Sequence, residues 1–236
     1  MAQAIRQMPW WLSPLLVVVA LGGFSVYAFW AALQGYGEFE NYLSPFYSPK
    51  LPSPWRWLSP AFLILWIPFG FRATCYYYRK AYYRSFFWDP PACAIKEMRA
   101  EKYSGETAFF VINNIHRYFL YGAIVVLGCL WYDAVQAFTF NGRFGMRLGS
   151  LIFLVNVVLL SLYTFSCHSL RHLIGGNLDC YSCVAAGAAR HKTWRWVSVL
   201  NERHVLWAWL SLFSVMAVDV YMRLLMAGLI SDVRFL

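Results

Sequence analysis

Residues 148–183 read LGSLIFLVNVVLLSLYTFSCHSLRHLIGGNLDCYSC. The first part of this stretch is apolar and long enough to cross a membrane as a helix, which takes about 20 residues. The second part brings four side chains of metal-binding types close together in the sequence: His168, His172, Cys180 and Cys183. This order predicts a membrane-spanning helix that ends at a metal site.

The spacing of the four side chains favours one shared site. His168 and His172 are four residues apart, so a helix places both imidazoles on one face. The Gly175-Gly176 pair is expected to stop that helix, and Cys180-x-x-Cys183 can present two thiolates to one centre. Two imidazoles and two thiolates are the ligand set of a Rieske-type [2Fe–2S] cluster. Zinc accepts the same set.

Three further side chains stay open as ligands: Cys167, His116 and His204. His116 opens the third expected span and His204 opens the fifth. Each could also pair with a histidine at the end of the fourth span as the two axial ligands of one haem b. A haem would leave Cys180-x-x-Cys183 without a role. The sequence therefore leaves an iron–sulfur cluster, a haem b and a structural zinc ion as alternatives, with the iron–sulfur cluster favoured.

The composition defines the class of protein. Of the 236 residues, 60% are hydrophobic, and the mean hydropathy is +0.47. A soluble domain of this size has no need for so much apolar surface, so we expect an all-α membrane protein. The formal net charge of +9 indicates basic loops at one membrane face. No basic run is interleaved with polar recognition residues, so we expect no nucleic-acid partner.

The chain is expected to form a single transmembrane domain over residues 1–236, with five transmembrane helices. The expected spans cover about 10–33, 58–77, 115–138, 148–173 and 204–230. Cys75 and Cys129 lie in apolar runs, and we interpret both as small buried side chains. Asp219 and Arg223 are four residues apart in the last span and are expected to form an ion pair.

The distribution of cations predicts the orientation. The connections after the first and third spans hold only Lys50, Arg56, Arg143 and Arg147. The connections after the second and fourth spans are far more basic, with Arg79, Lys80, Arg84, Lys96, Arg99, Lys102, Arg190, Lys192, Arg195 and Arg203. The positive-inside rule then places the N-terminus inside, the C-terminus outside and the His/Cys stretch at the cytoplasmic end of the fourth span.

Two motifs carry a resemblance to a known family. The segment His168-Ser-Leu-Arg-His172-Leu, with Asp179 beyond it, resembles a segment of the cytochrome b membrane anchors of succinate dehydrogenase and fumarate reductase. With Cys180-x-x-Cys183 added, the chain is similar to the haem-free SdhC type of actinobacterial succinate dehydrogenases, in which a Rieske-type cluster lies in the membrane subunit. The chain departs from the two-haem anchors because it lacks their outer histidines, and from the soluble Rieske pattern of C-x-H…C-x-x-H.

This resemblance implies a subunit of complex II in the bacterial plasma membrane. The chain would anchor an iron–sulfur subunit and a flavoprotein subunit, and it would pass electrons through the [2Fe–2S] cluster to menaquinone or ubiquinone. It would belong to an enzyme without itself acting on succinate, and we assign it no catalytic residue. We expect Arg171, His204 and Trp194 to contribute to the quinone site, although Arg171 could equally be an arginine that reaches the membrane surface. Membrane lipids and further copies of the whole complex are expected partners.

Two other functions remain open at this point. One is a quinone oxidoreductase subunit with a single haem b. The other is a transporter or assembly protein with a structural zinc ion. The scarcity of carboxylates in the expected spans and the absence of paired broken-helix repeats argue against a transporter.

Overall fold

The computed structural model describes residues 9–53, 55, 58–87, 112–140 and 142–235. The helices are α2 (Leu12–Leu33), α3 (Ala61–Ala73), α4 (Tyr76–Phe86), α5 (Ile112–Gln136), α6 (Leu148–Phe165), α7 (His168–Arg171), α8 (Gly187–Glu202) and α9 (His204–Met226), with a π-helical turn η2 (His172–Gly176). Two antiparallel hairpins pair β1 (Glu38–Phe39) with β2 (Tyr42–Leu43) and β3 (Thr139–Phe140) with β4 (Arg143–Phe144). Lys96, Arg99 and Lys102 of the expected basic connection lie outside the described residues.

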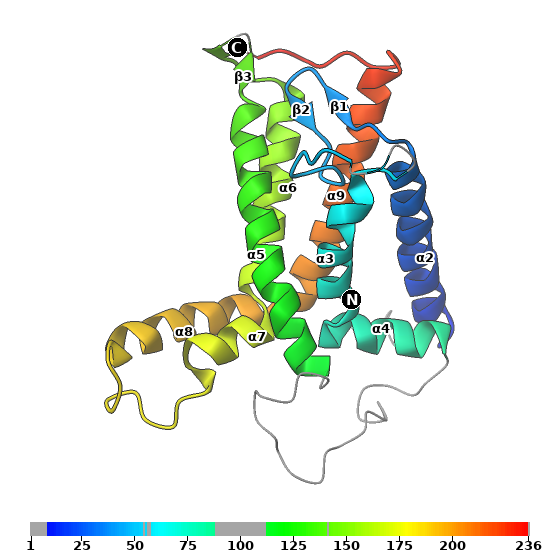
Figure 1. Cartoon of the computed structure of the whole chain (residues 1–236). Coiled ribbons are helices and arrows are strands. Elements are labelled where there is room, and N and C mark those ends of the chain that lie inside the picture. The colour runs from blue at the N-terminus through cyan, green and yellow to red at the C-terminus, as the bar shows by residue number, and fades with distance from the viewer. Residues whose placement is uncertain (1–8, 54, 56–57, 88–111, 141, 236) are drawn as a thin grey trace.

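The helices form an elongated bundle with two different ends (Figure 1). α2, α3, α5, α6 and α9 run along the bundle, and α6 packs closely on α5 and α9. α4 and α8 lie across one end, which we call the α4/α8 end. Both hairpins and the C-terminal segment lie at the opposite end, which we call the hairpin end.

Four of the described helices, α2, α5, α6 and α9, are long and apolar enough to cross a membrane. This confirms the prediction of an all-helical, multi-span protein. α3 has 13 residues, fewer than the roughly 20 that a full crossing takes. The fifth span and the direction of insertion therefore stay predictions.

At the α4/α8 end, two of the expected spans end earlier than the sequence suggested. α3 follows Pro60, contains Pro68 and stops at Ala73, and α4 then turns across the bundle. α6 stops at Phe165 and is followed by the short helix α7. The residue at each break is a cysteine with extended backbone: Cys75 has φ −64° and ψ 130°, and Cys167 has φ −62° and ψ 137°.

The remaining expectations for this region are met in part. The helical stretch after Cys167 ends at Gly176, as the Gly175-Gly176 pair predicted. The basic connection expected after the fourth span is not a simple loop, because it contains the 16-residue helix α8.

The hairpin end is held by buried carboxylates. Arg223 and Asp219 form the predicted ion pair at 2.7 Å, and Asp219 is 1% exposed. Asp219 also accepts hydrogen bonds from Tyr27 and Ser44, which lie on α2 and in the loop after β2. Because these hydrogen bonds join α2 and the loop after β2 to α9, the carboxylate stabilises the packing of these segments.

Candidate metal centre

Two cysteine–histidine pairs lie inside the bundle at the α4/α8 end. His116 Nε2 lies 3.2 Å from Cys167 Sγ, and His204 Nε2 lies 3.6 Å from Cys75 Sγ. All four side chains are buried, with exposed fractions from 0% for Cys167 to 6% for His116. Cys75 and Cys167 belong to one apolar core cluster. We call Cys75, His116, Cys167 and His204 the buried centre.

Each member of the buried centre comes from a different segment. Cys75 and Cys167 are the residues at which α3 and α6 give way to the next helix. His116 lies in the second turn of α5, and His204 is the first residue of α9. The four donors therefore meet only when the bundle is assembled.

The residue before each cysteine anchors one histidine. His116 Nδ1 lies 2.9 Å from Thr74 Oγ1, and His204 Nδ1 lies 2.6 Å from Ser166 Oγ. The contacts are exchanged between the two cysteines. Thr74, which precedes Cys75, holds the histidine that faces Cys167, and Ser166, which precedes Cys167, holds the histidine that faces Cys75.

The hydroxyl groups also fix the tautomer of each imidazole. Thr74 Oγ1 donates its hydrogen to the Gly70 carbonyl at 2.6 Å, and Ser166 Oγ donates to the Tyr163 carbonyl at 3.0 Å. Each hydroxyl has one hydrogen, so its oxygen accepts the Nδ1–H of the histidine. Both Nε2 atoms are then left with a free lone pair directed at the thiols, which is how metal-binding histidines are held.

Aromatic rings enclose the buried centre. Phe71 stacks on His116 with 4.8 Å between ring centroids and an interplanar angle of 2°. Tyr163 stacks on His204 at 5.1 Å, and Tyr77 packs against the same ring. This shell separates the four donors from solvent, and in such a dry environment unpaired polar groups are costly.

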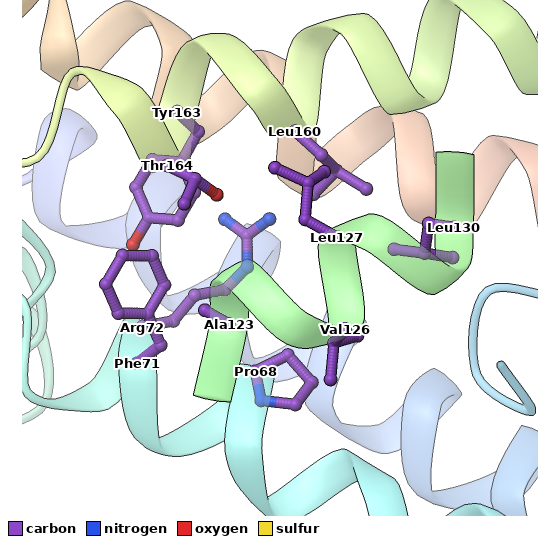
Figure 2. A pocket seen from close by; sticks show the side chains of 10 residues that line it. All are labelled: Pro68, Phe71, Arg72, Ala123, Val126, Leu127, Leu130, Leu160, Tyr163 and Thr164. Atoms are coloured by element: carbon purple, nitrogen blue, oxygen red, sulfur yellow. The ribbon is translucent and has the colours of Figure 1, made fainter. Parts of the chain in front are cut away.

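Two arginines lie in the same part of the bundle. Arg72 donates to Tyr78, to the Ala208 carbonyl and to Ser211, and its guanidinium lies 4.6 Å from the Tyr163 ring. Figure 2 shows this guanidinium pointing into a small cavity of about 50 Å³ between α3, α5 and α6. Arg79 on α4 is 0% exposed and donates to Asn113, and its burial lowers the pKa of the guanidinium. Both arginines therefore bring positive charge into this end of the bundle.

The donor types of the buried centre, two thiols and two imidazoles, are those of a Rieske-type cluster. Among the described residues, no three His, Cys, Asp or Glu side chains are grouped as the ligands of one metal ion. A Rieske-type cluster takes only two protein ligands for each iron, whereas a structural zinc ion takes four. Two thiols and two imidazoles with fixed tautomers meet the first requirement.

The structure does not gather the four residues that the sequence analysis selected. Cys180 and Cys183 are joined in a disulfide. His168 Nδ1 lies 3.3 Å from Asn201 Oδ1 on α8, and His172 is partly buried in η2. We call His168, His172, Cys180 and Cys183 the loop motif. Its residues are adjacent in sequence but do not converge on one point.

The residues expected at a quinone site fall into two groups. Arg171 donates to Ser198 at 2.8 Å, and its guanidinium lies 4.8 Å from the Trp194 ring. His204 belongs to the buried centre instead. The indole Nε1 of Trp194 is buried and has no hydrogen-bond partner within the described part of the chain.

The sequence analysis interpreted Cys75 as a small buried side chain and kept Cys167 and His116 as alternative ligands. It assigned His204 to the quinone site and also kept it as an alternative ligand. A signal was present, because a hydroxyl residue precedes a cysteine at the end of two apolar runs, at Thr74-Cys75 and at Ser166-Cys167. In the structure His116 lies in the second turn of α5, and His204 is the first residue of α9.

Comparison with known proteins places the chain in a family. A family model described as actinobacterial succinate dehydrogenase subunit SdhC matches residues 12–228. The chain belongs to this family. No curated protein matches.

A solved structure supports the assignment. The chain is similar to a chain in the Mycobacterium smegmatis Sdh1 complex in the apo form, with 42% sequence identity and a TM-score of 0.80. The similarity covers 98% of this chain and 93% of that chain. This SdhC protein is therefore a subunit of a succinate dehydrogenase, an oxidoreductase of the bacterial inner membrane, and it crosses that membrane several times.

Proposed function

We propose that this SdhC subunit passes electrons to a quinone through a Rieske-type [2Fe–2S] cluster held by Cys75, Cys167, His116 and His204. The observation that carries the proposal is the pairing of two imidazole Nε2 atoms with two buried thiols at 3.2 and 3.6 Å. When bound, such a cluster carries one electron at a time at about −150 to +300 mV, above the potential of plant-type clusters.

The residues of the chain prepare this site in three ways. Cys75, Cys167, His116 and His204 would hold the cluster, because two thiolates and two imidazoles are the ligand set of a Rieske centre. Thr74 and Ser166 hold the rings by their Nδ1–H groups, so each Nε2 keeps its lone pair for the metal. The aromatic rings of Phe71 and Tyr163 exclude water from the imidazole faces.

Other cofactors account for fewer of these features. A haem b could use His116 and His204 as axial ligands, but it would leave both buried thiols without a role.

The quinone would bind near the α4/α8 end. Arg171 and Trp194 stay our proposed contacts, because the buried Trp194 indole N–H is a donor without a partner among the described residues. Trp207 has the same property and lies three residues after His204. A quinone carbonyl would satisfy either donor, and reduction to the quinol would take two electrons and two protons.

We also propose that the α4/α8 end faces the cytoplasm and carries the iron–sulfur subunit, with the flavoprotein bound to that subunit. Its described cations include Lys80, Arg84, Lys192, Arg195 and Arg203. The positive-inside rule favours this direction. The buried centre would then lie within reach of the docked iron–sulfur subunit.

Electron paramagnetic resonance on the purified complex tests the ligand assignment. Cys75→Ser and Cys167→Ser should each remove the signal of the reduced Rieske-type cluster and lower the iron content. The signals of the clusters in the iron–sulfur subunit should remain. Cys129→Ser is the matched control, because Cys129 lies in the middle of α5, away from the buried centre, and it should leave the signal unchanged.

The proposal fails if the signal survives in both Cys75→Ser and Cys167→Ser. If the signal is lost instead in Cys180→Ser, the cluster belongs to the loop motif. An α-band of haem b in the reduced-minus-oxidised visible spectrum would favour a haem b at this site in place of the cluster.

A further inference from the structure

The buried centre leaves one motif of the sequence without a role. Cys180 and Cys183 lie in the connection between η2 and α8 and form a disulfide, with 5.4 Å between their Cα atoms. Cys180 is partly buried and Cys183 is exposed. Within this chain the pair is therefore more accessible than the buried thiols of Cys75 and Cys167.

The surroundings of the pair suit thiol chemistry. The 16-residue helix α8 begins at Gly187, four residues after Cys183, and its first two turns carry Arg190, His191 and Lys192. The positive end of a helix and nearby cations favour the thiolate that attacks a disulfide. Asp179 is the opposing charge beside the pair.

The expected compartment argues against a permanent cross-link. The positive-inside rule places this end of the bundle in the cytoplasm, where small thiols keep most disulfides reduced. A pair that can close without rearrangement of the chain, and that meets reducing partners, is expected to open and close.

We propose that Cys180 and Cys183 form a redox-active dithiol/disulfide site that exchanges with a small-molecule disulfide. One thiolate attacks the small disulfide, forms a mixed disulfide and releases one small thiol. The second thiolate then attacks the protein sulfur of that mixed disulfide and releases the second small thiol. The protein loses two electrons and two protons, and the small disulfide gains them.

The contacts of Tyr181 show which part of the chain the redox state of the pair can affect. Tyr181, between the two cysteines, donates to the Gly175 carbonyl at 2.8 Å and packs against His191 and Trp194. Closing the ring restrains Tyr181 against η2 and α8. The redox state of the pair therefore acts on the connection beside Trp194 and not on the buried centre.

The test is a thiol titration of the detergent-purified complex in mixtures of reduced and oxidised glutathione. Alkylation and peptide mass spectrometry should show Cys180 and Cys183 passing together from mostly reduced to mostly oxidised. The Cys180→Ser variant should trap one glutathione on Cys183, and Cys129→Ser should behave as the wild type. The resonance signal of the buried centre, recorded on the same samples, should not change.

Two results would overturn the site. In one, the wild-type pair stays closed in pure reduced glutathione or stays open in pure oxidised glutathione. In the other, Cys180→Ser takes up no glutathione. Neither result depends on a cluster at the buried centre, so failure here and failure of the proposed function can be told apart.

Discussion

The buried centre and the loop motif each contain two cysteines and two histidines, and they differ in how the chain supplies them. The loop motif comes from one short stretch, and its side chains are largely exposed and scattered. The buried centre comes from four separate segments, and its side chains meet in a dry core. Close spacing in a sequence shows that residues are neighbours along the chain, whereas a metal centre also needs them to converge.

The largest effect should come from the histidines. His116→Ala and His204→Ala should each lower quinone reduction by at least about 100-fold, since losing a ligand costs more than losing the group that supports it. Succinate oxidation with a dye that accepts electrons from the soluble subunits should be retained. His168→Ala and His172→Ala are the matched controls, and near-normal quinone reduction is expected in both. Equal losses in all four variants would contradict the distinction between the two regions.

The next effect should come from the hydroxyl groups that hold the histidines. Ser166→Ala and Thr74→Val should lower cluster occupancy or quinone reduction about 10–100-fold, because each ring loses the acceptor of its Nδ1–H. Ser166→Thr and Thr74→Ser keep the hydroxyl and should recover most of the activity. The readouts are iron content and the position of the resonance signal. Equal defects in the hydroxyl-free and hydroxyl-bearing variants would show that the hydroxyl has no such role.

The smallest effect on the cluster should come from the loop motif. The double variant Cys180→Ser/Cys183→Ser should retain the wild-type iron content and resonance signal, because no contact joins the disulfide to the buried donors in the described structure. Iron analysis of the purified complex measures this directly. Loss of about two irons per complex would show that the loop motif holds the cluster.

Much of the fold could be predicted from the sequence. Long apolar runs identify α2, α5, α6 and α9, because burial in lipid depends on composition and length. The end of α3 before Cys75 could not be predicted in the same way. An apolar run continues up to it, and the turn into α4 depends on packing of the bundle.

The donor types proposed for the candidate site and the residues proposed to supply them depend on different information. The donor types, two thiols and two imidazoles, follow from composition and the resemblance. Their identity depends on which helix ends meet, and periodicity along one helix carries no information about that. Cys75 in particular looks like any small apolar side chain until His204 is placed beside it.

An experimental density map of the whole complex tests the central claim most directly. The account predicts strong density for two metal ions between the sulfurs of Cys75 and Cys167 and the Nε2 atoms of His116 and His204. Density for a cluster at Cys180 and Cys183, or thiols and imidazoles in direct contact with nothing bound between them, would contradict it.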